Sequence, residues 1–224
     1  MSRLSELVKT ILLIITALFP IVNPLGSSPI FLSLTQEYGA ATRKILARKV
    51  AVNSFVLLVA SFIIGSHILA FFGISIPVVQ VGGGLIVIST GWTLLTQKDS
   101  PDRHGEVRKN VNPLDAFRNA FYPLTLPLTV GPGSISIAVT LGANEPRHFG
   151  ANALAIGAAI IGSALLAGSV YLCYGFADRL AQALGENGMT IVVRLSSFLL
   201  VCIGVQILWN GVSALVRGLS LTGG

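Results

Sequence analysis

Charged residues are scarce in this chain. Asp, Glu, Lys and Arg make up 11% of its 224 residues, while 53% are hydrophobic. A soluble domain carries about 25% charged residues and needs them for its polar surface, so the composition predicts an integral protein of the lipid bilayer. The net charge of +6 comes from basic residues between apolar stretches. Such residues are typical topology signals and do not indicate nucleic-acid binding.

Cysteines, buried carboxylates and catalytic motifs are also few or lacking. Cys173 and Cys202 both fall in apolar stretches, which predicts packing and not a disulfide or a metal pair. No CxxC, HExxH or P-loop pattern occurs. No Asp or Glu lies deep in an apolar run, which argues against a carboxylate proton relay. We therefore expect no catalytic residue, metal site or cofactor, and no enzymatic activity.

Six apolar segments are long enough to cross a bilayer, which takes about 20 residues. They cover residues 7–35, 50–72, 76–96, 115–142, 149–176 and 190–216. The loops between them leave no room for a soluble domain. The predicted fold class is therefore all-α: a polytopic membrane protein with six transmembrane helices.

Two of these segments contain helix breakers. Residues 19–31 hold three prolines and Gly26, and residues 122–135 hold three prolines with Gly131 and Gly133. Proline removes a backbone donor and clashes with the preceding turn. Both segments are also longer than a straight span requires. Each is therefore predicted to be a helix, an unwound turn near the midplane, and a short second helix.

The order broken, unbroken, unbroken occurs twice along the chain. We predict a 3+3 inverted repeat, with residues 1–96 and 113–224 as the two three-helix repeats and 97–112 as a cytoplasmic linker. Eleven basic residues at the first, third and fifth loops, against four on the other side, predict that those loops are cytoplasmic and that both termini are periplasmic.

The breaks predict a binding site. We expect Ser28 to cap the second half of the first broken segment, and Ser134 that of the other. Helix N-termini offer free N–H groups and a partial positive charge, which suit a carboxylate without a buried Lys or Arg. The predicted substrate-binding residues are Asn23, Gly26, Ser27, Ser28, Thr129, Gly131, Gly133 and Ser134. The alternative is a pair of proline kinks with no ligand.

The stretches Asn23-Pro24-Leu25-Gly26-Ser27-Ser28-Pro29 and Pro123-Leu124-Thr125-Leu126-Pro127-Leu128-Thr129-Val130-Gly131-Pro132-Gly133 resemble the MarC family. The resemblance covers essentially the whole chain. It implies a bacterial or archaeal inner-membrane protein with six predicted spans. Because the family is also called the neutral amino acid transporter family, it implies a small neutral amino acid as one candidate substrate.

The sequence thus favours an inner-membrane transporter of small neutral amino acids or similar zwitterions, working by alternating access around the breaks. A non-transporting membrane scaffold and an intramembrane enzyme are the alternatives. The substrate, the direction of transport, a coupling ion such as H⁺ or Na⁺, and assembly into a homo-oligomer are left open.

Overall fold

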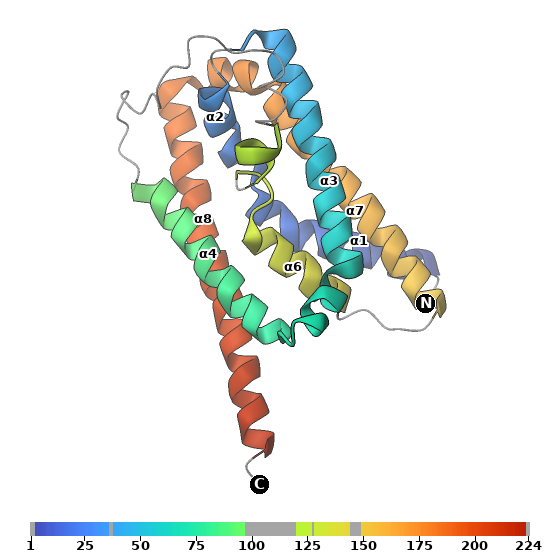
Figure 1. The fold of residues 1–224 in the computed structure, drawn as a ribbon. Helices are drawn as coiled ribbons and strands as arrows, with labels where there is room; N and C mark the ends of the chain where they lie inside the picture. The colour runs from blue at the N-terminus through green and yellow to red at the C-terminus, as the bar shows by residue number, and fades with distance from the viewer. Residues whose placement is uncertain (1–2, 36–37, 97–119, 127, 144–148, 223–224) are drawn as a thin grey trace.

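The computed structural model describes residues 3–35, 38–96, 120–126, 128–143 and 149–222, and these are almost entirely helical (Figure 1). This confirms the all-α prediction. The helices are α1 (Arg3–Val22), α2 (Pro24–Leu34), α3 (Ala40–Phe71), α4 (Ile76–Thr96), the π-helical turn η1 (Ala120–Thr125), α6 (Pro132–Ala143), α7 (Phe149–Gly175) and α8 (Ala177–Thr222). The predicted linker 97–112 and residues 115–119 lie outside the described residues.

Five helical stretches of the described chain are long and apolar enough to cross a membrane. They are Leu4–Leu34, Ala40–Phe71, Ile76–Thr96, Ala153–Gly175 and Asn187–Gly218. The predicted fourth segment does not form a continuous long helix, because its described part holds only η1 and the 12-residue α6. Many large apolar side chains point outward, such as Phe71 at 84% exposure and Trp92 at 59%, as a lipid-facing surface requires.

A break in the first segment is confirmed at Asn23, as a single residue between α1 and α2 and not as an unwound turn. This residue adopts the left-handed conformation (φ 45°, ψ 58°), and its side chain accepts a hydrogen bond from the Gly26 N–H at 3.1 Å. Asn tolerates this conformation better than most residues, and Pro24 then suits the first helical position. The N-cap of α2 is therefore Asn23, and the predicted capping role of Ser28 is wrong. Ser28 is fully buried and donates to the Cys173 carbonyl at 3.0 Å.

The second break is longer. The chain leaves η1 at Thr125 and resumes a regular helix only at Pro132, with Tyr122 in a non-helical conformation (φ −126°, ψ 125°). Gly131 precedes α6, and the Ser134 hydroxyl donates back to the Gly131 carbonyl at 2.9 Å. The prediction that Ser134 is the N-cap is wrong, because Pro132 fits the first helical position and starts α6 two residues earlier.

The core surrounds both breaks. One buried cluster includes Val22, Phe31 and Leu124, and the Phe31 ring stacks on Tyr174 with centroids 4.4 Å apart. A second cluster includes Val130. Backbone that leaves a helix within a membrane must be shielded from lipid by protein, and these clusters provide that shielding.

Helices α4 and α8 pack at close range through glycines. A Cβ atom at Gly84 would lie 2.8 Å from the Gly204 carbonyl oxygen, and one at Gly91 would lie 2.9 Å from the Ser197 carbonyl oxygen. Small residues of this kind let helix backbones approach each other in membranes. Gly83 also lies at close range, against Ser136 of α6, whereas Gly82 faces open space.

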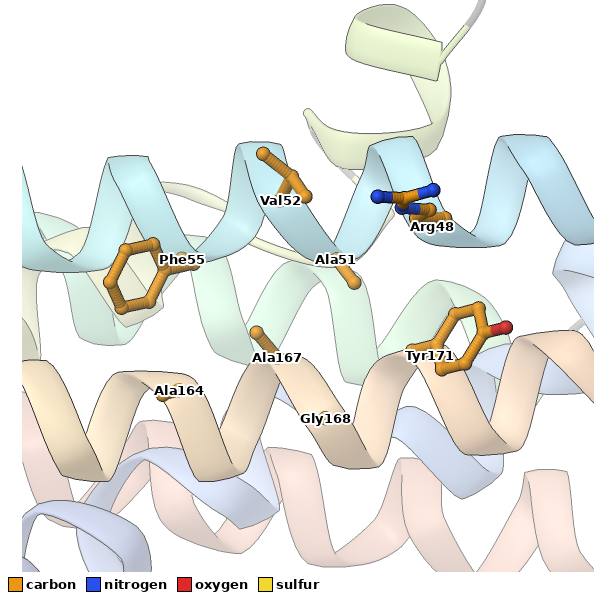
Figure 2. Close-up of a pocket in the computed structure, with 8 residues that line it drawn as sticks. All are labelled: Arg48, Ala51, Val52, Phe55, Ala164, Ala167, Gly168 and Tyr171. Carbon is orange, nitrogen blue, oxygen red and sulfur yellow. The ribbon is translucent and has the colours of Figure 1, made fainter.

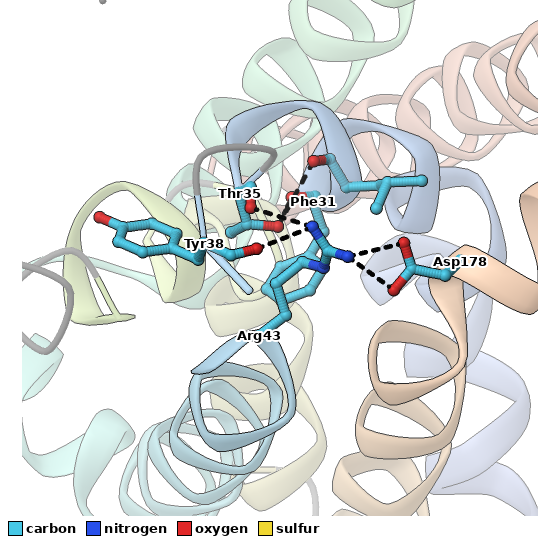
Figure 3. Close-up of polar contacts among 6 residues, drawn as sticks. Phe31, Thr35, Tyr38, Arg43 and Asp178 are labelled. Carbon is cyan, nitrogen blue, oxygen red and sulfur yellow. Dashed lines mark hydrogen bonds and ion pairs between the residues drawn. The ribbon is translucent and has the colours of Figure 1, made fainter. Parts of the chain in front are cut away.

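One ion pair ties the connections at one end of the molecule together (Figure 3). Arg43, on the first turn of α3, donates to both carboxylate oxygens of Asp178 on α8, at 2.9 and 3.0 Å. The same guanidinium donates to the Tyr38 carbonyl at 2.9 Å and the Thr35 carbonyl at 3.5 Å, just beyond the end of α2. Arg43 thus links the end of α2 to the start of α8.

Candidate functional site

A cavity of about 300 Å³ borders both helix breaks. Its walls come from the last turn of α1, from α2, α4 and α8, and from the chain between η1 and α6. The lining side chains are all apolar or carry a hydroxyl: Ile21, Ser27, Ile30, Leu34, Ile86, Val87, Thr90, Leu94, Pro123, Leu128, Thr129, Gly131, Pro132, Gly133, Ser134 and Leu200.

The cavity brings together five of the eight residues predicted from sequence: Ser27, Thr129, Gly131, Gly133 and Ser134. The other three lie outside its lining and have structural roles. Asn23 caps α2, and Ser28 bonds to α7. Gly26 provides room, because a Cβ atom there would lie 2.7 Å from the Ser196 Cβ of α8.

The N-terminus of α6 forms one wall of this cavity. The bond from the Ile135 N–H to the Gly131 carbonyl, at 3.1 Å, opens the helix, and Pro132 has no N–H to offer. The amides of Gly133 and Ser134 therefore precede that first bond, and both residues line the cavity. Such amides, together with the helix dipole, favour an anionic group. Gly133 is required for space, because a Cβ atom there would lie 2.1 Å from Val87 Cγ2.

Hydroxyl groups hold the unwound stretch before α6 in place. Thr129 Oγ1 donates to the Leu124 carbonyl at 2.7 Å and lies 2.9 Å from the Tyr174 hydroxyl of α7. Thr125 Oγ1 donates to the Ala120 carbonyl at 2.7 Å and accepts from Asn53 Nδ2 of α3 at 3.3 Å. Both threonines are buried. Their bonds therefore satisfy hydroxyl and carbonyl groups that would find no hydrogen-bond partner in lipid.

Sequence reasoning missed the contribution of α4. Ile86, Val87, Thr90 and Leu94 recur at helical spacing on one face and line the cavity, with Val87 against Gly133 at the start of α6. The spacing alone shows that these residues share a face of α4. It does not predict what that face contacts, because the helix is apolar all round. The close approach of Gly83 to Ser136, where a Cβ atom would lie 2.6 Å from the Ser136 Cβ, sets the rotation of α4 against α6.

No ionisable side chain is among the described residues that line the cavity. A ligand with a net charge would lose its hydration there without gaining an opposite charge, and this loss costs several kcal/mol per ion. The site therefore suits a ligand whose own charges cancel, or one that is uncharged and polar.

The model of the MarC family, described as "MarC family integral membrane protein", matches residues 8–216 of this chain. The chain belongs to the MarC family. It is 32% identical to UPF0056 membrane protein YvbG of Bacillus subtilis over 202 residues, which cover 89% of this chain and 92% of the relative. It is 31% identical to UPF0056 inner membrane protein MarC of Salmonella typhimurium over 220 residues, covering 95% and 98%. UPF0056 membrane protein MJ1677 of Methanocaldococcus jannaschii is 29% identical over 201 residues, covering 90% and 95%.

Membership in this family confirms the predicted resemblance. Together with the five apolar helices, it identifies the chain as a multi-pass protein of the inner membrane. No solved structure matches this chain. The names of the relatives indicate no catalytic function.

Proposed function

We propose that this MarC-family protein transports a small zwitterion, such as a neutral amino acid, through the cavity between its two helix breaks. The observation that carries the proposal is a cavity bordered by both breaks and lined by no ionisable side chain. Its volume of about 300 Å³ lies at the lower limit of ligand pockets. This size favours a small metabolite over a drug-sized molecule.

The two ends of a zwitterion have matching partners in this cavity. The carboxylate would accept hydrogen bonds from the Gly133 and Ser134 amides at the α6 N-terminus, as anions do at such sites. The ammonium would face the carbonyl end of α1 near Ile21, which carries the partial negative charge of the helix dipole, and the Ser27 hydroxyl beside it. Discontinuous helices bind substrates in this manner in other transporter folds.

The packing partners support the inverted repeat that the sequence predicts. Helix α3 packs on α7 and α4 packs on α8, which pairs each unbroken helix with its counterpart. The half-helix α2 packs on α8, and its counterpart α6 packs on α4. Two units related by a two-fold axis would contact each other in this way. Alternating access would then be a rocking of residues 113–224 against residues 1–96.

The position of the termini supports the predicted topology. Figure 1 marks both termini toward the end of the molecule away from the α2–α3 and α7–α8 connections. The basic residues Arg43, Lys44, Arg48, Lys49 and Arg179 cluster near those connections. By the positive-inside rule, the connections would be cytoplasmic and both termini periplasmic. Reporter fusions after Gly224 should then behave as periplasmic, and a cytoplasmic signal would reverse the orientation.

The proposal is tested by uptake of radiolabelled neutral amino acids into proteoliposomes that contain the purified full chain. We expect saturable uptake of at least one of them, and stabilisation of the purified protein against heating by the same compound. Failure of every neutral amino acid in both assays would overturn the proposed substrate class.

Two serines provide a matched pair of variants for the site. Ser134→Ala removes a hydroxyl that bonds to the Gly131 carbonyl and so positions the amides at the cavity wall, and Ser28→Ala removes one of similar burial that bonds to α7. We expect Ser134→Ala to weaken ligand binding, whereas Ser28→Ala should lower stability by about 1 kcal/mol and leave binding unchanged. Equal effects of both changes on binding would place the site elsewhere.

We propose no catalytic step in this cavity. Within the described ranges, no three His, Cys, Asp or Glu side chains come together as metal ligands would. The serine and threonine hydroxyls of the cavity have no acidic or basic side chain beside them in its lining, so a nucleophile would lack its activating base.

A further inference from the structure

A second hollow lies outside the proposed transport site, on the surface between α3 and α7. It has a volume of about 520 Å³, and we call it the α3–α7 groove. Each helix contributes four residues at spacings of three, four and seven, so one face of each helix forms one wall. The lining residues are Arg48, Ala51, Val52 and Phe55 from α3, and Ala164, Ala167, Gly168 and Tyr171 from α7.

The groove has an apolar floor made of small residues. Ala51 and Ala167 are buried at its base, and Ala164 and Gly168 are exposed along its wall. A Cβ atom built at Gly168 would meet nothing within 4 Å. The side chains leave space here that a slender apolar chain could fill, and seven residues of helix give the groove a length of about 10 Å.

The two ends of the groove differ in chemistry. Arg48 and Tyr171 lie at one end, and Phe55 and Ala164 lie at the other (Figure 2). Arg48 is exposed and lies two to three turns from the start of α3, and Lys44 lies one turn before it on the same helix face. No acidic side chain is among the described residues that line the groove. The basic end therefore lies toward the helix terminus and the apolar end toward the middle of the span.

We propose that the α3–α7 groove binds an anionic phospholipid, with its phosphate at Arg48 and an acyl chain between the two helices. The occupant follows from charge and polarity. A phospholipid places its negative charge near the membrane surface and its methylene chain toward the midplane, in the same order as the groove. Basic pockets between transmembrane helices bind anionic headgroups in this way. The inference does not depend on the proposed transport activity.

Native mass spectrometry of the purified full chain, with phosphatidylglycerol or phosphatidylcholine added, tests this proposal. We expect phosphatidylglycerol to bind about fivefold more tightly than phosphatidylcholine, which is the effect of one basic residue near an anionic headgroup. Arg48→Gln should remove that preference and leave binding of phosphatidylcholine unchanged. Gly168→Leu should fill the groove and weaken the binding of both lipids.

Each variant has a matched control. Arg179→Gln removes one charge from an exposed arginine at the start of α8, where its partner is the Phe176 ring at 5.4 Å. Gly157→Leu adds the same side chain as Gly168→Leu at another glycine of α7 with nothing within 4 Å, about three turns away on the same helix face. Both controls should bind the two lipids as the unmodified chain does. If Gly168→Leu fails to fold, Arg48→Gln still tests the headgroup contact.

Three results would overturn the proposal. Equal binding of the two lipids by the unmodified chain would remove the selection for negative charge. Loss of the preference in Arg48→Gln with no effect of Gly168→Leu would indicate attraction at the surface and an empty groove. A change from dimer to monomer in Gly168→Leu, with lipid binding unchanged, would assign the groove to a second copy of this chain.

Discussion

The two helix breaks border one cavity, but they satisfy their backbone groups in different ways. The first is a single left-handed residue, Asn23, whose side chain accepts a hydrogen bond from the Gly26 amide. The second runs from η1 to Pro132 and is held by the hydroxyls of Thr125 and Thr129. Gly133 and Ser134, at the start of α6, line the cavity. The first break is therefore capped by its own side chain, whereas threonine hydroxyls hold the second.

This difference assigns a role to each half-helix. Helix α2 is held at both ends, by Asn23 at its start and by Arg43 beyond its end, so it acts as a fixed wall. At α6, the Ser134 hydroxyl donates to the Gly131 carbonyl and so caps none of the helix amides, which is why we propose its N-terminus as the better anion site. The repeats would then be similar in packing and unequal in binding.

The largest effect is expected from Gly26→Ala. The new Cβ atom would lie 2.3 Å from Asn23 Nδ2 and 2.7 Å from the Ser196 Cβ. Overpacking costs about 1–3 kcal/mol, and displacement of the Asn23 cap would add about 1 kcal/mol. Thermal unfolding of the purified protein should show this loss, while the fraction that remains folded keeps its ligand affinity. Reduced affinity with unchanged stability would show that Gly26 contributes to binding and not to packing.

Gly133→Ala, unlike Gly26→Ala, should weaken ligand binding. Its Cβ atom would meet Val87 Cγ2 at 2.1 Å across the cavity wall, which costs about 1–3 kcal/mol and moves the α6 amides. We expect ligand-induced stabilisation to be lost. The double variant Gly133→Ala/Val87→Ala removes the clashing methyl group and should recover part of both stability and binding. No recovery in the double variant would show that the contact with Val87 does not explain the glycine.

Two substitutions of Asn23 distinguish the effect of its left-handed backbone conformation from that of its capping side chain. Asn23→Ala removes the cap, worth about 0.5–2 kcal/mol, whereas Asn23→Gly costs only a few tenths, because glycine adopts φ 45° without strain. In chemical or thermal unfolding, the Asn23→Ala variant should therefore be less stable than the Asn23→Gly variant. The reverse order would mean that the left-handed conformation does not hold the first break.

The smallest effect is expected at the far end of α2. Asp178→Asn removes the ion pair with Arg43. The Arg43 side chain is 17% exposed and the Asp178 side chain is 43% exposed. Partly exposed pairs of this kind contribute about 0.2–1 kcal/mol. A double-mutant cycle with Arg43→Gln, measured at low and high salt, should give a coupling of this size that weakens as salt rises. A coupling that salt leaves unchanged would argue for a contact shielded from solvent.

Composition and helix breakers determined much of this protein without the structure. Few charges and long apolar runs specify a bundle of membrane helices, because lipid leaves no other use for such segments. The prolines and glycines indicate that two segments break, but the predicted caps at Ser28 and Ser134 are wrong, because Pro24 and Pro132 take the first helical positions. These local effects also placed five cavity residues, Ser27 among them, near a break.

Only the tertiary structure decided which residues near the breaks line the cavity. Asn23 and Ser28 have the same polarity as Ser27 and Ser134, yet one caps a helix and the other bonds to α7. The wall from α4, with Val87 and Thr90, depends on how its glycines seat it against α6 and α8. Packing sets the rotation of a uniformly apolar helix, and no pattern within that helix encodes it. The sequence alone therefore specifies the breaks, and the packing around them specifies the cavity.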